Sequence, residues 1–236
     1  MNVSGMNWMQ LEERLRRDDR AVLPIGCTEQ HAYLSLATDS ILAERVATEA
    51  AEPLGVPVFP ALAYGIAPSF LAYPGTLSLR AETHAAVLHD LLDGLAATGF
   101  RRVLIVNGHG GNGPGLATVP EWGARHPGVR VRVHSWWNAP RTWARVQSID
   151  PQSSHASWME RFAWTQVAGV EAPTARKPMA DPEALRRLDP RAVRARLGDG
   201  SYGGLYQRSE ADAAALWQAG VEETRAAIEG PWEDRS

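Results

Sequence analysis

The stretch Ala21-Val22-Leu23-Pro24-Ile25-Gly26-Cys27-Thr28-Glu29-Gln30-His31 passes from an apolar run to polar and charged residues, and it decides the fold. Its apolar part predicts a short buried strand that ends in a turn. Glu29 and His31 are two residues apart, so on a strand their side chains would point to the same face. Asp39 opens the apolar-periodic stretch 41–51, which predicts a helix. We therefore expect two carboxylates and an imidazole at a strand-to-helix junction, a ligand set typical of hydrolytic divalent-metal sites.

Two later segments supply further polar groups. Residues 101–106 read as a buried strand that runs into Asn107-Gly108-His109-Gly110-Gly111-Asn112, a turn in which backbone can approach a ligand closely. His155 and Glu160 are five residues apart, so on one helix they would share a face only roughly. If His155 lies just before the first turn of a helix, both side chains can reach one cavity.

The chain alternates strand-like and helix-like stretches. This alternation predicts an α/β fold with a mostly parallel sheet covered by helices on both faces, in which ligands bind beyond the carboxyl ends of the strands. Residues 171–206 show only weak hydrophobic periodicity. We therefore interpret them as an irregular segment near the mouth of the site or at a subunit interface. The expected strands are 21–27, 56–64, 102–107 and 129–136, and the expected helices lie near 6–18, 39–52, 81–98, 113–125, 156–167 and 210–229.

Composition narrows the class of protein. The 236 residues, of which 44% are hydrophobic and 22% charged, indicate one globular domain spanning 1–236. A net charge of −3 argues against nucleic acid as a partner, and no apolar stretch is long enough to span a membrane. The N-terminus lacks the pattern of a signal peptide, and the single cysteine, Cys27, rules out an internal disulfide. We expect a cytoplasmic protein.

Two of these features have a second interpretation. The glycine turn at 107–112 also resembles a phosphate cradle, but it lacks the Lys-Ser/Thr pair of a P-loop and the Gly-x-Gly-x-x-Gly spacing. Cys27 is either a nucleophile with His31 as its base or a buried strand cysteine near the site.

In their order and spacing, these segments resemble the creatininase-like metal-dependent amidohydrolases. The family pattern Gly-x-x-Glu-Gln-His appears at residues 26–31, followed by the aspartate at 39 and the Asn-Gly-His-Gly-Gly-Asn turn at 107–112. His-Ala-x-x-x-Glu follows at 155–160, and Tyr73-Pro74-Gly75-Thr76 is similar to the family's Pro-Gly-Thr turn. The resemblance covers residues 21 to about 165 and implies a three-layer α/β/α fold with a mostly parallel central sheet.

The chain also departs from the family pattern. After His31 it is one residue shorter than many relatives and lacks their second histidine. Creatininase carries a glutamate two residues after the glycine-turn histidine, where this chain has Gly111. The carboxylate for a second metal must then come from elsewhere, and Glu160 is the candidate. Many relatives have another glutamate where this chain has Trp158.

The resemblance implies a site with two divalent metal ions, zinc first and manganese or iron as alternatives. Glu29 and His109 would hold one ion, His31 and Glu160 the other, and Asp39 would bridge them because a carboxylate has two oxygens. Two ions roughly 3.5–4 Å apart can lower the pKa of a shared water. The resemblance also implies a homo-oligomer, a hexamer.

The expected reaction is hydrolysis of an amide C–N bond in a small or cyclic molecule. His155 and Glu160 are the candidate catalytic residues, with His155 passing a proton to the leaving nitrogen. The backbone N–H groups of Gly110 and Gly111 are expected to stabilise the oxyanion. Alternatives are a specialised peptidase or deformylase of the same fold, or a non-catalytic metal-binding scaffold. The other candidate substrate contacts are Thr76, Trp136, Trp137 and Trp158.

Overall fold

The computed structural model describes residues 2–232 and is built on a parallel sheet of three strands in the order β1-β2-β3. The strands are β1 (Arg20–Ile25), β2 (Arg102–Asn107) and β3 (Arg130–Ser135). Val22 pairs with Leu104, and Leu104 pairs with Arg132, so the three carboxyl ends meet at one edge. Parallel neighbours need long crossovers, and helices supply them.

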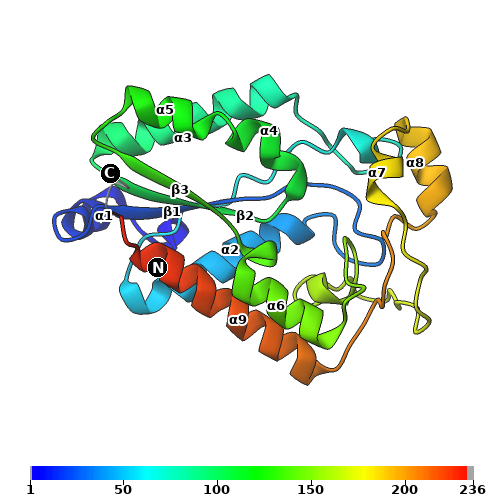
Figure 1. The fold of residues 1–236 in the computed structure, drawn as a ribbon. Helices are drawn as coiled ribbons and strands as arrows, with labels where there is room; N and C mark the ends of the chain where they lie inside the picture. The colour runs from blue at the N-terminus through cyan, green and yellow to red at the C-terminus, as the bar shows by residue number, and fades with distance from the viewer. Residues whose placement is uncertain (1, 233–236) are drawn as a thin grey trace.

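Helices cover both faces of this sheet and give the expected three-layer architecture. α2 (Thr38–Ala51), α6 (Pro140–Ile149) and α9 (Glu210–Glu229) lie on one face, and α3 (Ala81–Thr98) and α5 (Val119–Arg125) lie on the other (Figure 1). Val22 and Leu104 pack toward the first group, whereas Leu23 and Ile105 pack toward the second. The alternation of buried side chains along each strand therefore builds two cores. In residues 2–232, no helix is both long and apolar enough to cross a membrane.

The segment expected as a strand at 56–64 does not form one. It runs beside β1 and makes isolated parallel bridges, Val58 with Val22 and Leu62 with Ile25. Pro57 and Pro60 lack the N–H groups that a continuous ladder needs, so pairing is interrupted between the bridges.

The helices expected at 39–52, 81–98 and 210–229 are confirmed, and two others differ in extent. The first helix is shorter than 6–18, and the 113–125 stretch divides into two helices, the second with a proline in its first turn. Three helices were not predicted, including two in 171–206. The remaining elements are α1 (Trp8–Leu15), α4 (Gly113–Leu116), α7 (Pro182–Leu185), α8 (Pro190–Leu197) and the 3-10 turns Val3–Gly5, Glu52–Leu54, Pro68–Phe70, Gly110–Asn112, Trp136–Asn138 and Trp158–Glu160.

The helix expected at 156–167 is wrong. Only the 3-10 turn Trp158–Glu160 forms there, and Ala156 before it has a positive φ of 57°. The Thr165 side chain stabilises the turns over residues 160–165. Its hydroxyl donates to Glu160 O at 2.7 Å and accepts from Phe162 N–H at 2.9 Å. Such local side-chain bonds replace the hydrogen bonds of a helix.

Candidate metal centre

Glu29 and His31 lie in a loop rather than on a continuation of the strand. β1 ends at Ile25, so the argument that placed both side chains on one face of a strand is wrong. Hydrogen bonds hold the loop instead. Gln30 N–H donates to the Thr76 hydroxyl at 3.0 Å, and Glu29 N–H donates to Leu36 O at 3.0 Å. The Thr76 hydroxyl, expected to contact substrate, therefore positions the loop that carries Glu29.

Asp39 sits in the first turn of α2, and a glycine brings the β2 turn against it. A Cβ atom at Gly108 would lie 2.4 Å from Asp39 O, closer than side-chain carbons approach backbone. Because Gly108 has no side chain, the turn can place His109 directly over α2.

The resulting cluster joins residues from three segments. His109 Nδ1 lies 3.0 Å from Asp39 Oδ2 and 3.3 Å from Glu29 Oε1. His31 Nε2 lies 3.1 Å from Asp39 Oδ1 and 3.9 Å from Glu160 Oε2. The two oxygens of Asp39 thus face different imidazoles, which divides the cluster into two halves. Glu29, His31, Asp39 and His109 are each no more than 7% exposed.

Backbone carbonyls fix both imidazole rings from behind. His31 Nδ1 lies 3.2 Å from Glu29 O, and His109 Nε2 lies 3.0 Å from Ile66 O. When each of these nitrogens carries its hydrogen and donates to its carbonyl, the opposite nitrogen of the ring faces the carboxylates. This arrangement, with one nitrogen tethered and the other directed at acidic groups, is typical of metal-binding histidines.

The charges of the cluster also fit a cation. Burial raises the pKa of Glu29 and raises that of Glu160 to about 7. Burial opposes charge on His31, yet the neighbouring carboxylate of Asp39 raises the pKa of His31 to about 10, and that of His109 is likewise raised. The same two imidazoles outweigh burial at Asp39 and hold its pKa below the usual range. Without a metal, protons on the imidazoles balance the buried carboxylates.

Three polar atoms of this cluster form no well-directed hydrogen bond with any of the described residues. They are Glu29 Oε2, His31 Nε2 and Asp39 Oδ2, all buried. Leaving such atoms unpaired is costly, whereas divalent ions would pair all three and release the imidazole protons. The residues present therefore fit the expected metals, with Glu29, Asp39 and His109 forming one potential ligand group and His31, Asp39 and Glu160 another.

His155 borders the cluster without sitting at its centre. Its Nδ1 lies 3.7 Å from Glu29 Oε1, and its Nε2 lies 2.8 Å from the Gln30 side-chain nitrogen. Its ring stacks on Phe70 at 5.0 Å. Burial and the nearby His31 lower the pKa of His155 well below its ordinary value. Glu160 reaches the cluster through the turn after His155, accepting from Ala156 N–H at 2.6 Å.

Comparison with known proteins shows the family of this chain. Residues 4–228 match the family model described as creatinine amidohydrolase. The chain belongs to the creatininase family. A solved creatininase, a glutamate-to-glutamine variant of the Zn-Zn type, matches with a TM-score of 0.76 and 25% identity over 99% of this chain and 98% of that one.

Two curated relatives match over part of their length. The creatinine amidohydrolase of Pseudomonas putida is 29% identical over 163 residues, which are 64% of this chain and 63% of that protein. The mycofactocin precursor peptide peptidase of Mycolicibacterium smegmatis is 36% identical over 106 residues, 42% of each chain. The chain therefore matches less than two thirds of either relative's length.

The structure explains why this chain differs from creatininase itself at Gly111. A Cβ atom at Gly111 would lie 2.1 Å from Ile66 O, the carbonyl that tethers His109. A glutamate at this position has no room here, which agrees with a carboxylate supplied from the loop at Glu160. Asn112, whose role the motif alone did not reveal, is fully buried and donates to Gly26 O and Asn107 Oδ1, both at 3.1 Å. It ties the turn to the loop after β1.

The tryptophans expected to contact substrate separate into two groups. Trp136 and Trp158 are each 1% exposed and lie in the core between the sheet and α9, with Trp136 5.7 Å from the Trp217 ring. Their expected role as substrate walls is therefore corrected to core packing. Trp137 is half-buried, and a Cβ atom at Gly110 would lie 3.6 Å from its ring. It lies beside the glycine turn, and its contact with substrate stays a prediction.

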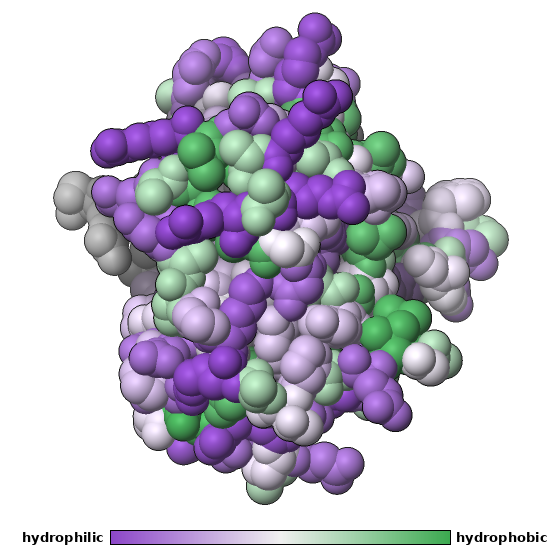
Figure 2. Space-filling model, turned by 90° about the vertical axis from the view of Figure 1, so that its right-hand side faces the viewer, coloured by the Kyte–Doolittle hydropathy of each residue, from purple (hydrophilic) through white to green (hydrophobic). Residues whose placement is uncertain are grey.

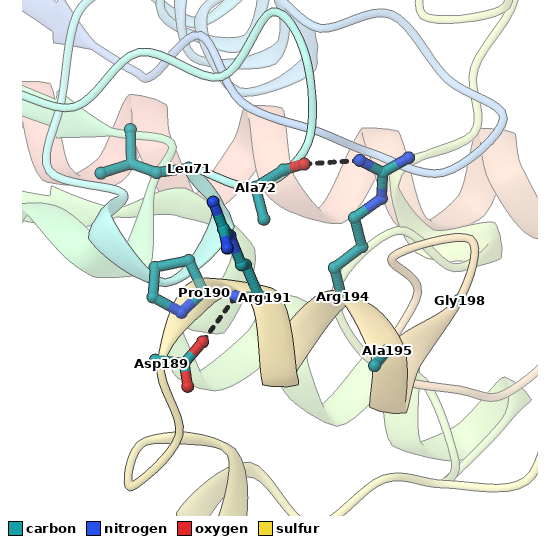
Figure 3. Close-up of a pocket in the computed structure, with 8 residues that line it drawn as sticks. All are labelled: Leu71, Ala72, Asp189, Pro190, Arg191, Arg194, Ala195 and Gly198. Carbon is teal, nitrogen blue, oxygen red and sulfur yellow. Dashed lines mark hydrogen bonds between the residues drawn. The ribbon is translucent and has the colours of Figure 1, made fainter.

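A surface hollow of about 990 Å³ is lined by none of the predicted ligands. Leu71 and Ala72 form one side of it and α8 with its two ends forms the other, and Asp189 accepts from Arg191 N–H at 2.9 Å (Figure 3). Arg194 crosses to Ala72 O at 2.7 Å and holds α8 against this loop. The hollow contains none of the predicted site residues, so we assign the chemistry to the buried cluster.

Proposed function

We propose that this protein is a divalent-metal-dependent hydrolase that cleaves an amide C–N bond in a small or cyclic molecule. The observation that carries the proposal is the position of Asp39, whose two oxygens face two separately tethered imidazoles in a buried acidic cluster. This is the arrangement expected of a bridging ligand. Membership of the creatinine amidohydrolase family supports the choice of bond.

The proposed ligands are Glu29, Asp39 and His109 for one ion, and His31, Asp39 and Glu160 for the other. Two ions in these positions would polarise the carbonyl of the substrate and lower the pKa of a water held between them. Zinc is proposed, with manganese or iron as alternatives, because nitrogen and oxygen ligands suit all three.

The remaining chemistry falls to side chains and backbone of this chain. His155 Nδ1 faces the cluster, and the amide of Gln30 holds the far side of the ring. Because its lowered pKa leaves the ring neutral, His155 is placed to take a proton from the attacking water and pass it to the leaving nitrogen. Glu160 belongs to the second ligand group, so a bound ion would keep its carboxylate ionised, and its proposed catalytic contribution is to hold that ion. The N–H groups of Gly110 and Gly111 are proposed to bind the oxyanion, and Trp137 to bound the substrate.

The alternative within the same fold is a specialised peptidase or deformylase, which the similarity to the mycofactocin peptidase favours. Elemental analysis of the purified protein, followed by assays on lactams, formamides and short peptides, tests both proposals. We expect up to two ions per chain and cleavage of one class of amide. Protein with no stoichiometric metal and no activation by added metal would contradict both. A loaded protein inactive on every amide would indicate a non-catalytic metal scaffold.

We further propose a cytoplasmic homohexamer, as the family resemblance implies. Exposed apolar side chains on the loops around the carboxyl end of the sheet, Leu36, Leu71 and Leu77, support an association surface because each is at least 39% exposed. Figure 2 views the molecule from the side that carries α7 and α8 in Figure 1, where hydrophobic residues are interspersed among hydrophilic ones.

A further inference from the structure

We propose that the Cys27 thiolate is a fourth ligand of the ion held by Glu29, Asp39 and His109. This inference rests on the proposed metal centre and deepens it. It makes the two halves of the centre chemically different, because the other half, formed by His31, Asp39 and Glu160, offers only nitrogen and oxygen.

Cys27 meets the geometric requirement. The ligand atoms of Cys27, Glu29, Asp39 and His109 all lie within 4.8 Å of one another, and all four residues are buried. Bond lengths of about 2.3 Å for Zn–S and 2.0–2.2 Å for Zn–N and Zn–O place tetrahedral ligands about 3.3–3.8 Å apart. His109 Nδ1 already lies 3.3 Å from Glu29 Oε1 and 3.0 Å from Asp39 Oδ2. No other pair has to close by more than about 1.5 Å, a change that rotamer adjustments can supply.

Independent atoms at the same place also point to a ligand. Glu29 Oε2 and Asp39 Oδ2 are buried and satisfy no hydrogen bond among the described residues. They belong to the two carboxylates of the group that contains Cys27, and those residues are only 1% and 3% exposed. The sulfur thus shares its surroundings with Glu29 Oε2, which has no partner among the described residues, and with Asp39 Oδ2, whose neighbour is His109 Nδ1 at 3.0 Å.

The surroundings of Cys27 do not match those of an ordinary core cysteine. A buried free cysteine usually behaves as a small hydrophobic residue. Cys27 is fully buried, yet it belongs to none of the hydrophobic clusters found in residues 2–232. Its sulfur makes a weak contact with Leu77 O at 3.9 Å, whereas Ser40 Oγ holds the Cys27 carbonyl at 3.3 Å. The backbone is fixed beside α2, while the sulfur lies beside the imidazole of His109.

A thiolate would change which metal this half of the centre prefers. Soft sulfur ligands favour zinc over manganese, whereas carboxylate and imidazole ligands discriminate less between them. The thiol proton leaves to solvent as the sulfur binds the ion. We therefore expect the half containing Cys27 to retain zinc, while the half containing His31 exchanges zinc for manganese more readily.

X-ray absorption spectroscopy of the zinc-loaded full chain tests the inference directly. Because Cys27 is the single cysteine, a Zn–S shell at about 2.3 Å can come from no other thiolate. We expect this shell in the wild type and its loss in Cys27→Ser, which replaces the thiol with a hydroxyl of similar size. The cobalt-loaded protein should show a sulfur-to-cobalt charge-transfer band that Cys27→Ser lacks.

Competition between zinc and manganese provides a second measurement. Loss of an outer-shell partner typically weakens metal affinity 10–100-fold, so we expect Cys27→Ser, which removes a direct ligand, to weaken zinc binding by at least about 100-fold. Manganese binding should weaken less, because manganese gains less from sulfur. A wild-type protein that binds zinc through nitrogen and oxygen alone would overturn this inference and leave the proposed function intact. A wild-type protein that binds no metal would overturn the proposed function as well.

Discussion

Asp39 organises the centre because each of its oxygens faces a different imidazole. Glu29 and His109 lie on one side of it, and His31 and Glu160 lie on the other. A residue shared by both halves affects both when it is removed, whereas any other ligand affects one.

We expect Asp39→Ala to lose more metal than any other single ligand variant. Elemental analysis after gel filtration of Asp39→Ala, His109→Ala and His31→Ala would measure the ions retained per chain. The latter two variants should each retain one ion. If Asp39→Ala kept both ions while His109→Ala lost them, Asp39 would not be the bridge.

We expect His155 to transfer a proton and not to bind a metal ion. We expect His155→Ala to keep both ions and to lose roughly 10²–10⁴ in kcat, the usual size of a general acid–base contribution. The loss should shrink for substrates whose leaving amine is weakly basic, because they need less protonation. Steady-state kinetics across a series of leaving groups, with metal content measured in parallel, checks this.

Two outcomes would assign His155 differently. Loss of metal from His155→Ala would make it a ligand, as its 3.7 Å distance to Glu29 Oε1 allows. An equal loss of rate for every leaving group would mean that it positions the substrate.

At the scale of elements, the close approach of the β2 turn to α2 depends on Gly108. We expect Gly108→Ala to cost about 1–3 kcal/mol in the free energy of unfolding, because its Cβ would overlap with Asp39 O, and to weaken metal binding by displacing His109. Gly94→Ala is the matched control. Gly94 lies within α3, and a Cβ there meets nothing within 4 Å, so alanine should stabilise by up to about 1 kcal/mol. Denaturant unfolding and zinc titration of both variants would test this, and an undisturbed Gly108→Ala would contradict it.

The contact between β3 and α9 should make stability depend on pH. His134 on β3 lies 3.0 Å from Thr224 Oγ1 on α9, and burial lowers its pKa from 6.5 to about 4. The unfolded chain therefore binds more protons than the folded one between these values, so the free energy of unfolding falls as pH falls. The loss from pH 7 to pH 5 should be about 2 kcal/mol.

The His134→Gln variant isolates this effect because glutamine can bond to Thr224 but does not titrate. Unfolding of both proteins by denaturant at pH 7 and pH 5 should show the smaller pH dependence in the variant. If the free energy of unfolding changed equally with pH in the two proteins, His134 would not be the cause of the pH dependence.

At the scale of the whole molecule, the family fold leaves apolar side chains exposed on loops at the carboxyl end of the sheet. If the protein is the proposed hexamer, light scattering at micromolar concentration should give a mass near six times the 25.7 kDa of one chain. Leu71→Lys and Leu77→Lys should then lower the mass, since buried charge opposes association. A mass near 25.7 kDa for the unaltered protein would contradict the hexamer.

The sequence by itself determined the class of fold and the family, and it named the acidic and imidazole groups that meet in the cluster, though not Cys27 as a ligand. Apolar periodicity located α3 and β2 with the same bounds that the structure shows. Such patterns are reliable because a helix or strand that buries one or both faces repeats its apolar residues at a fixed interval. The Glu-Gln-His and glycine-turn motifs indicated the acidic and imidazole groups because their chemistry is local to each segment.

Only the tertiary structure decided the role of each of these groups. The loop position of Glu29 depends on Thr76, which is far away in the sequence, and the turn that carries Glu160 is held by Trp158 N–H, which donates to the distant Leu205 O at 2.8 Å. Likewise, Trp136 and Trp137 are neighbours in the sequence, yet one lies under α9 and the other beside Gly110. Local patterns cannot separate such cases, because long-range contacts determine which side of each residue meets the core and which meets the site.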